Sequence, residues 1–194
     1  MFIQTAQTPN PDTLKFLPGQ VVAGDAGPFD FADAASAGVS RLAQALFDLG
    51  QVERVFLGAD FISISKAETA DWAQVKPLAL AAIMDHFVAG LPVVDAGADT
   101  GTSEPVGDET SYEGETAEIV NEIKELIETR VRPAVAQDGG DIVFHKFEED
   151  TGIVHLHMRG ACAGCPSSAY TSQQVIDNML LAYVPEVTSV EAVL

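Results

Sequence analysis

The chain has 194 residues, and 47% of them are apolar, which argues against extensive disorder because this composition can furnish packed cores. Its 29 acidic and 10 basic residues give a formal net charge of −19, and a polyanion of this size repels nucleic acid and anionic membranes, so neither is expected as a partner. No apolar run in the sequence approaches the length needed to cross a bilayer.

The N-terminal segment, MFIQTAQTPNPD, lacks the features of a targeting sequence. It has neither the charged start and apolar core of a secretory signal nor the arginine-rich composition of an organelle transit peptide. We therefore expect a soluble cytoplasmic protein.

The first half of the chain predicts a compact α+β module. Short apolar runs between turn residues indicate strands, and apolar residues at helical spacing indicate helices. The expected elements are two strands at 1–5 and 13–18 joined by the turn TPNPD, a helix at 33–49, a hairpin at 52–66 and a helix at 71–88. Pro77 inside the last helix predicts either a kink or a later start. This module spans residues 1–92 and contains no cysteine.

Residues 93–114 differ in composition from the sequence on either side. They read VVDAGADTGTSEPVGDETSYEG, with six acidic residues and no basic one. Such a segment offers too little apolar surface to offset the entropy of ordering it, and its like charges repel each other. We expect an acidic, flexible linker between two domains.

Residues 115–194 predict the order α-β-β-α-β. The expected elements are an amphipathic helix at 115–131, strands at 141–147 and 152–159, a helix after a cysteine loop and a last strand at 187–193. The second helix presents one apolar face, which consists of Val175, Ile176, Met179, Leu180 and Tyr183. We expect one mixed or antiparallel sheet with helices packed on it. The whole chain is then of the α+β class, with two small α/β-sandwich domains and a CxxC loop before the second helix of the C-terminal one.

The two cysteines of the chain, Cys162 and Cys165, lie in the segment MRGACAGCPSSA. Proline is favoured at the first position of a helix, so Pro166 predicts that Cys165 is the N-cap. The amides and dipole at a helix start favour thiolate over thiol, and Arg159 adds a nearby cation. The small residues around the thiols let backbone and solute approach closely. Together these features predict a dithiolate site with little steric cover.

Two closely spaced thiols in one chain allow three kinds of chemistry. Iron–sulfur clusters normally require four thiolates, so a cluster would bridge two identical chains about a two-fold axis. The pair could instead cycle between dithiol and disulfide. A third alternative is zinc held by the cysteines with the two nearest histidines, His155 and His157.

The histidines also have a simpler interpretation. His155 and His157 are two positions apart on a predicted strand, so they share one face, while Val154, Leu156 and Met158 form the other face and fit the core. A solvated strand face explains the two histidines better than zinc ligation does. The turn QDGGD has two interpretations as well: its glycines either shape a loop against the thiol site or serve a helix-to-strand turn with positive φ.

The wider sequence around these motifs resembles a known family. QDGGDIVF, MRGACAGCPSS and the terminal VPEVTSVEAV resemble the C-terminal domain of the NifU/Nfu family of iron–sulfur scaffold and carrier proteins. The opening MFIQTAQTPNPDTLKFLPG is similar to the N-terminal domain of the Nfu type found in alphaproteobacteria and mitochondria. The resemblance covers nearly the whole chain outside residues 93–114.

This resemblance implies a carrier and not an enzyme. Cys162 and Cys165 would be the cluster ligands, two subunits would form a homodimer around a 4Fe-4S cluster, with 2Fe-2S as a second form, and the cluster would pass to client apo-proteins after delivery by upstream assembly proteins. The remaining alternative in a different class is a dithiol–disulfide oxidoreductase that uses the same pair. The resemblance also refines the expected location to the bacterial cytoplasm, or to the mitochondrial matrix if a presequence is missing.

Overall fold

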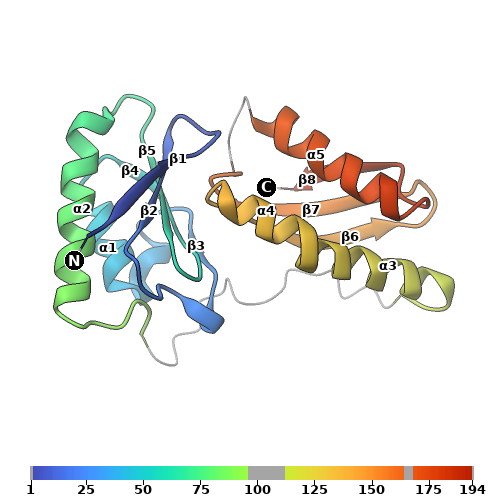
Figure 1. Ribbon diagram of the computed structural model, residues 1–194, viewed down its shortest axis with the longest axis horizontal. Helices are drawn as coiled ribbons and strands as arrows, with labels where there is room; N and C mark the ends of the chain where they lie inside the picture. The colour runs from blue at the N-terminus through green and yellow to red at the C-terminus, as the bar shows by residue number, and fades with distance from the viewer. Residues whose placement is uncertain (1, 96–111, 164–167, 194) are drawn as a thin grey trace. The chain divides into compact units, whose positions relative to one another are not determined.

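A computed structural model describes residues 2–95, 112–163 and 168–193, with the side chains of its last range described from residue 176 onward. The chain separates into two compact units, Met1–Ser103 and Glu104–Leu194, each with its own β-sheet and helices (Figure 1). The α+β class predicted from the sequence is confirmed. Most of residues 93–114 lie outside the described residues, so the linker stays a prediction. Within the described ranges, no helix is long and apolar enough to cross a membrane.

The N-terminal unit is an antiparallel sheet of five strands in the order β1-β2-β5-β4-β3. Its elements are β1 (Gln4–Gln7), β2 (Thr13–Leu17), the 3₁₀ turn η1 (Gly24–Ala26), β3 (Phe29–Phe31), the 3₁₀ turn η2 (Ser36–Val39), α1 (Arg41–Phe47), β4 (Val52–Leu57), β5 (Ile62–Lys66) and α2 (Trp72–Val88). Every second residue of the central strands enters a core shared with α1 and α2, as the alternation of side chains in a strand requires. The predicted hairpin at 52–66 is therefore confirmed.

Two expectations for this unit need correction. The helix expected at 33–49 is shorter, because Ser40 has an extended backbone and caps the start of α1 by accepting a hydrogen bond from the Ala43 N–H. The late helix start that Pro77 allowed is wrong, since α2 begins at Trp72 with the Asp71 side chain as its cap. Strand β3 is only three residues long and carried no clear pattern in the sequence.

The turn TPNPD is fixed by side chains from distant parts of this unit. Within it, the Asn10 side chain accepts the Asp12 N–H at 3.0 Å. Lys66 donates to the Asp12 carboxylate at 2.6 Å, and the Trp72 indole N–H donates to the Pro11 carbonyl at 3.1 Å. The turn therefore ties strands β1 and β2 to the end of β5 and the start of α2, which agrees with a structural use of this motif.

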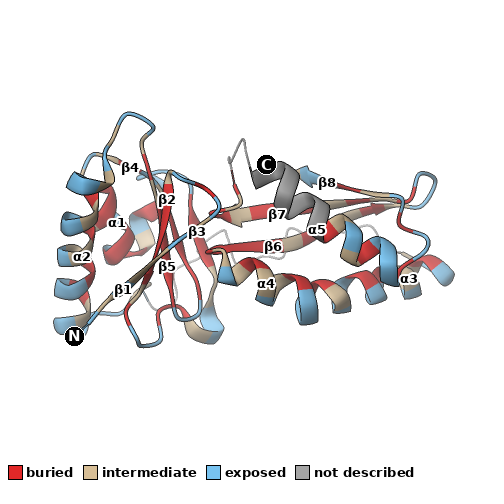
Figure 2. Ribbon diagram, turned by 45° about the horizontal axis from the view of Figure 1, so that its top comes forward, coloured by how far each residue is buried: buried red, intermediate tan, exposed pale blue. Residues whose placement is uncertain are grey.

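The C-terminal unit contains a three-stranded mixed sheet in the order β6-β7-β8, antiparallel between β6 and β7 and parallel between β7 and β8. Its elements are α3 (Glu115–Leu126), the π-helical turn η3 (Ile127–Val131), α4 (Arg132–Gln137), β6 (Gly140–Glu148), β7 (Ile153–Gly160), α5 (Ser168–Tyr183) and β8 (Ser189–Val193). The predicted order α-β-β-α-β is confirmed. Buried residues follow the strands of both sheets, and the helices carry exposed residues on their outer faces (Figure 2).

The first helix of this unit extends past its expected end at residue 131, to Gln137. Its hydrogen bonding changes at η3, where the Arg132 N–H donates to the Ile127 carbonyl five residues earlier. Pro133 follows and has no N–H, so the regular bond to the fourth residue back is missing at that position. The chain widens into a π-helical turn here and then continues as α4.

The core of the C-terminal unit matches most of the predicted pattern. Val154, Leu156 and Met158 are buried, as are Ile176 and Leu180 of α5. The assignment of Tyr183 to the same apolar face is wrong, since Tyr183 is 47% exposed and its ring packs against the guanidinium of Arg130. Met179 is partly buried, and the side chain of Val175 lies outside the described residues.

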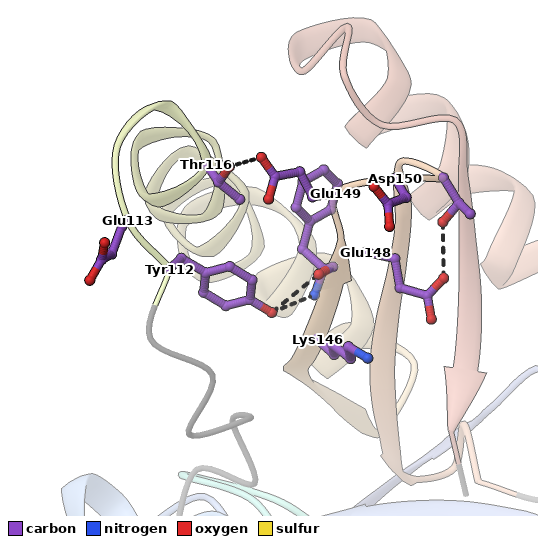
Figure 3. A pocket seen from close by; sticks show the side chains of 9 residues that line it. Tyr112, Glu113, Thr116, Lys146, Glu148, Glu149 and Asp150 are labelled. Atoms are coloured by element: carbon purple, nitrogen blue, oxygen red, sulfur yellow. Dashed lines mark hydrogen bonds between the residues drawn. The ribbon is translucent and has the colours of Figure 1, made fainter.

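The outer edge of β6 is covered by a tyrosine from the segment before α3 (Figure 3). The Tyr112 hydroxyl accepts the Phe147 N–H at 2.9 Å and donates to the Phe147 carbonyl at 3.3 Å. It thus satisfies both backbone groups that a neighbouring strand would otherwise pair. In the hollow beside it, Glu149 accepts a hydrogen bond from Thr116.

Replacing Tyr112 by Phe removes both of these hydrogen bonds and keeps the ring. We expect amide hydrogen exchange at Phe147 to accelerate roughly thirtyfold, because the two lost bonds together weaken local stability by ~2 kcal/mol. Tyr183→Phe is the matched control, since the Tyr183 hydroxyl accepts from Arg130 at the protein surface. Equal exchange rates at Phe147 in wild type and Tyr112→Phe would show that the hydroxyl does not protect this edge.

His86 near the end of α2 is 6% exposed, and burial lowers its pKa below the ordinary value of 6.5. The unfolded chain therefore binds a proton near pH 6.5 that the folded chain binds only at lower pH, so stability falls as the pH drops below about 6.5. We expect His86→Leu to be more stabilising, or less destabilising, at pH 5.5 than at pH 8.

Urea unfolding followed by the fluorescence of Trp72, the one tryptophan of the chain, measures this effect in the N-terminal unit. The same variant at pH 8, where the imidazole is neutral in both states, serves as the control. An identical change in unfolding free energy at both pH values would contradict the prediction.

Candidate functional site

Cys162 lies in the loop that follows β7 and folds back onto the turn before β6. Gly160 ends the strand with a φ of +63°, a conformation that favours glycine. The Ala161 N–H then donates to the Gly139 carbonyl at 3.2 Å, and the Ala163 N–H donates to the Gly160 carbonyl at 3.1 Å. Cys162 itself is half-buried and packs against the C-terminal core. The loop therefore holds the first thiol at the boundary between core and surface.

The QDGGD turn forms the floor under this thiol. A Cβ added at Gly140 would lie 2.5 Å from the Cys162 Sγ and 3.2 Å from its Cβ, so no side chain fits there without a shift. Gly139 has a φ of +80°, the left-handed conformation that a tight helix-to-strand turn needs. The two interpretations of this motif are thus both correct, one for each glycine: Gly139 makes the turn, and Gly140 makes room for the thiol.

A partly buried ion pair lies directly beside this floor. The Arg132 guanidinium donates from Nε to the Asp141 Oδ1 at 2.8 Å and from Nη2 to Oδ2 at 3.1 Å. A third nitrogen, Nη1, donates to both oxygens of Glu128 at 2.8 Å. Asp141 is 5% exposed, and its hydrogen bonds, opposed in part by burial, raise the pKa of Arg132 above its ordinary value. Sequence reasoning missed this pair, because it joins a helix and a strand nine residues apart.

Part of the predicted site lies outside the described residues. These include Cys165 and Pro166, so the helix cap expected at Cys165 is not tested. Helix α5 is assigned from Ser168 onward, which keeps the loop directly before a helix, as expected. Arg159, the expected nearby cation, is paired in strand register with Asp141 across β6 and β7.

The two histidines of β7 share one face of the strand, as predicted, and each contacts neighbours in the sheet. His155 lies between two carboxylates, with Nε2 3.3 Å from Glu148 and Nδ1 3.7 Å from Glu191. The His157 ring packs edge-on against His145 at 4.7 Å between centroids. Its pKa is lowered, first by burial and then by the charges of His145 and Arg159. Both are half-buried residues of the sheet face.

The zinc alternative has no further support in this geometry. In the part of the chain that the structure describes, no group of three or more His, Cys, Asp or Glu side chains is placed to hold a metal ion. What the structure does assemble is one thiol on a small-residue loop, over a glycine floor that an ion pair borders. The second thiol of the chain follows three residues later in the sequence.

Comparison with known proteins places both halves of the chain. Residues 3–90 match the family model described as "Scaffold protein Nfu/NifU N terminal", and residues 123–191 match the one described as "NifU-like domain". Among curated proteins, the chain is 48% identical over 193 residues to the "NFU1 iron-sulfur cluster scaffold homolog, mitochondrial" of Drosophila willistoni and to that of Drosophila persimilis. The alignments cover 100% of this chain and 64% and 65% of those relatives, so the chain spans somewhat less than two thirds of their length.

Solved structures with likeness to the chain include the NifU-like protein from Saccharomyces cerevisiae, with 26% identity and a TM-score of 0.45 over 50% of this chain and 86% of that chain. The two family models match in the order that the sequence predicted, and they account for most of the chain outside residues 93–114. The resemblance proposed from the motifs is confirmed. The chain belongs to the NifU/Nfu family of iron–sulfur scaffold proteins, with an Nfu-type N-terminal domain followed by a NifU-like domain.

Proposed function

We propose that this protein is an iron–sulfur cluster scaffold and carrier that binds a 4Fe-4S cluster between two subunits through Cys162 and Cys165 and transfers it to client apo-proteins. The observation that carries the proposal is the placement of Cys162 on a small-residue loop over Gly140, in a chain of this family. We also propose the domain division 1–92, 93–114 and 115–194, in which the last segment holds the cluster.

Ligand number supports the homodimer. An iron–sulfur cluster normally takes four cysteine thiolates, and each chain contains two cysteines. Two copies related by a two-fold axis supply the full set, with the same loop contributed by each. Cluster retention is then coupled to dimerisation and so depends on protein concentration. A 2Fe-2S form satisfies the same ligand count, so iron content separates the two forms.

The cluster is cargo in this proposal. A thiolate from an incoming client replaces one cysteine ligand at a time, so the cluster moves by ligand exchange and this protein breaks no substrate bond itself. The residues on either side of Cys162 are alanines, so no long side chain next to the thiol stands in the way of such a ligand. The protein is therefore a carrier and not an enzyme, with client apo-proteins and upstream assembly proteins as its partners.

The names of the relatives bear on the location of the protein. They describe mitochondrial proteins, which agrees with the mitochondrial alternative expected from the sequence. The bacterial cytoplasmic location has no support in the comparisons.

The alternative in a different class is a dithiol–disulfide oxidoreductase, and no observation favours it. Catalysed reduction of insulin by the purified protein, with no bound iron after anaerobic reconstitution, would support that alternative and remove the carrier proposal.

Replacing either cysteine by serine tests the ligand assignment. We expect Cys162→Ser and Cys165→Ser each to reduce iron after anaerobic reconstitution from about four per dimer to near zero, because one change removes two of the four ligands. Iron and sulfide analysis, with Mössbauer spectra for the cluster type, measures the outcome. Ala81→Ser on the exposed face of α2 is the control, since it adds a serine and keeps both thiols. A single cysteine variant that retains full iron and sulfide would exclude the proposed ligands.

Air-free size-exclusion chromatography with light scattering tests the shared site. We expect the cluster-loaded protein to elute as a dimer of the 20.5 kDa chain. Removing the cluster with a chelator should shift the equilibrium toward the monomer, because bound cluster adds its binding free energy to the dimer. Loaded protein that stays monomeric at every concentration would end the proposal of a subunit-bridging cluster.

A further inference from the structure

We propose that Arg132 and Asp141 are positioning residues for Cys162: their ion pair holds the Gly139–Gly140 turn against the thiol and so sets where the first ligand lies. The role of the pair in cluster retention rests on the proposed function. Its effect on the thiol itself does not, because that effect exists in the protein without a cluster.

The geometry of the pair is suited to fixing a position. Two nitrogens of one planar guanidinium bond to the two oxygens of one carboxylate, which defines both distance and orientation. Asp141 is 5% exposed and Arg132 is half-buried, so water competes little for these bonds. A lysine at position 132 keeps the charge but cannot reproduce the two parallel bonds.

The ion pair is placed where it can affect the position of the thiol. Arg132 is the first residue of α4 and Asp141 the second residue of β6, so the pair closes the helix-turn-strand segment between them. Inside that closed segment are the turn glycines. The Gly139 carbonyl accepts the Ala161 N–H, and the Gly140 backbone lies under the Cys162 Sγ. A displacement of β6 relative to α4 would therefore also move the backbone that contacts the cysteine loop.

The π-helical turn and Glu128 set the direction of Arg132. The Arg132 N–H bonds five residues back, to Ile127, so this residue begins α4 from a widened turn. The remaining guanidinium nitrogen, Nη1, donates to the Glu128 carboxylate, but the Glu128 side chain is 62% exposed. An exposed partner of this kind contributes little. The chain thus supplies its own matched control, since Glu128 and Asp141 bind the same arginine and only Asp141 belongs to β6.

A merely structural role for the pair would lower the stability of the whole unit without a specific effect on the thiol. The test therefore measures the reactivity of Cys162 in folded protein that holds no cluster. In the full-length chain with Cys165→Ser, one thiol remains, and its alkylation by iodoacetamide is followed by mass spectrometry at a single pH. Each variant is measured at a temperature where its unfolding curve shows it to be folded.

We expect Arg132→Lys and Asp141→Asn each to accelerate alkylation of Cys162 roughly threefold or more, because the half-buried thiol loses its fixed floor. Gly140→Ala should do the same, since its methyl group meets the sulfur. Glu128→Gln should stay close to the parent. Val120→Ala, which truncates a buried residue of the same unit, is the control for lowered stability and should also leave the rate unchanged.

The second arm uses both cysteines and the reconstituted cluster. We expect Arg132→Lys and Asp141→Asn to shorten the lifetime of the cluster under a chelator by a similar factor, while Glu128→Gln and Val120→Ala retain it. Parental alkylation rates in Arg132→Lys and Asp141→Asn would overturn the proposal, and so would equal acceleration in Val120→Ala. If the pair variants alter alkylation but the chain with both cysteines binds no iron on reconstitution, the positioning role stands and the proposed function is excluded instead.

Discussion

The C-terminal unit is organised around one steric constraint, the contact between the Cys162 sulfur and a backbone position that has no side chain. Gly140 must be glycine for the thiol to lie where it does, because even a methyl group would approach the sulfur to 2.5 Å. The cysteine loop can fold back on the sheet only where such a gap exists. Cys162 itself is half-buried, so its sulfur lies at the edge of the core, which suits the ligand role proposed for it.

The surrounding structure keeps this contact in place. The helix that precedes β6 widens at η3, since Pro133 supplies no N–H, and the widened turn directs Arg132 to Asp141 at the start of the strand. A bidentate, partly buried ion pair is costly to form, but it fixes geometry well once formed. The proline, the ion pair and the glycine turn follow one another along one short segment of the chain. Together they define the position of the backbone that lies under the thiol.

In the N-terminal unit, too, contacts from distant parts of the chain hold a short turn in place. The turn TPNPD contains no reactive group, yet Lys66 and Trp72 both bond to it from distant positions. Its residues are therefore explained by the joining of strands β1 and β2 to β5 and α2. Neither this turn nor the rest of the unit provides a cysteine. Both cysteines, and with them the chemistry of the proposed function, belong to the C-terminal unit, and the N-terminal unit has its own core.

The amino-acid sequence determined the class of the fold, the order of most elements and the identity of the two thiols, because these depend on local patterns. The patterns are the helical spacing of apolar residues, the spacing of the cysteines, and the alternation of side chains along β7, where Val154, Leu156 and Met158 face the core. Tertiary structure alone decided what surrounds Cys162. The Arg132–Asp141 pair and the use of Gly140 depend on packing between a helix, a strand and a loop, which no local pattern encodes. The two errors at element ends have different causes. The Ser40 cap is a local hydrogen bond with the Ala43 N–H, which the sequence pattern did not reveal, whereas Tyr183 is exposed because its ring packs against Arg130, a contact that only tertiary structure creates.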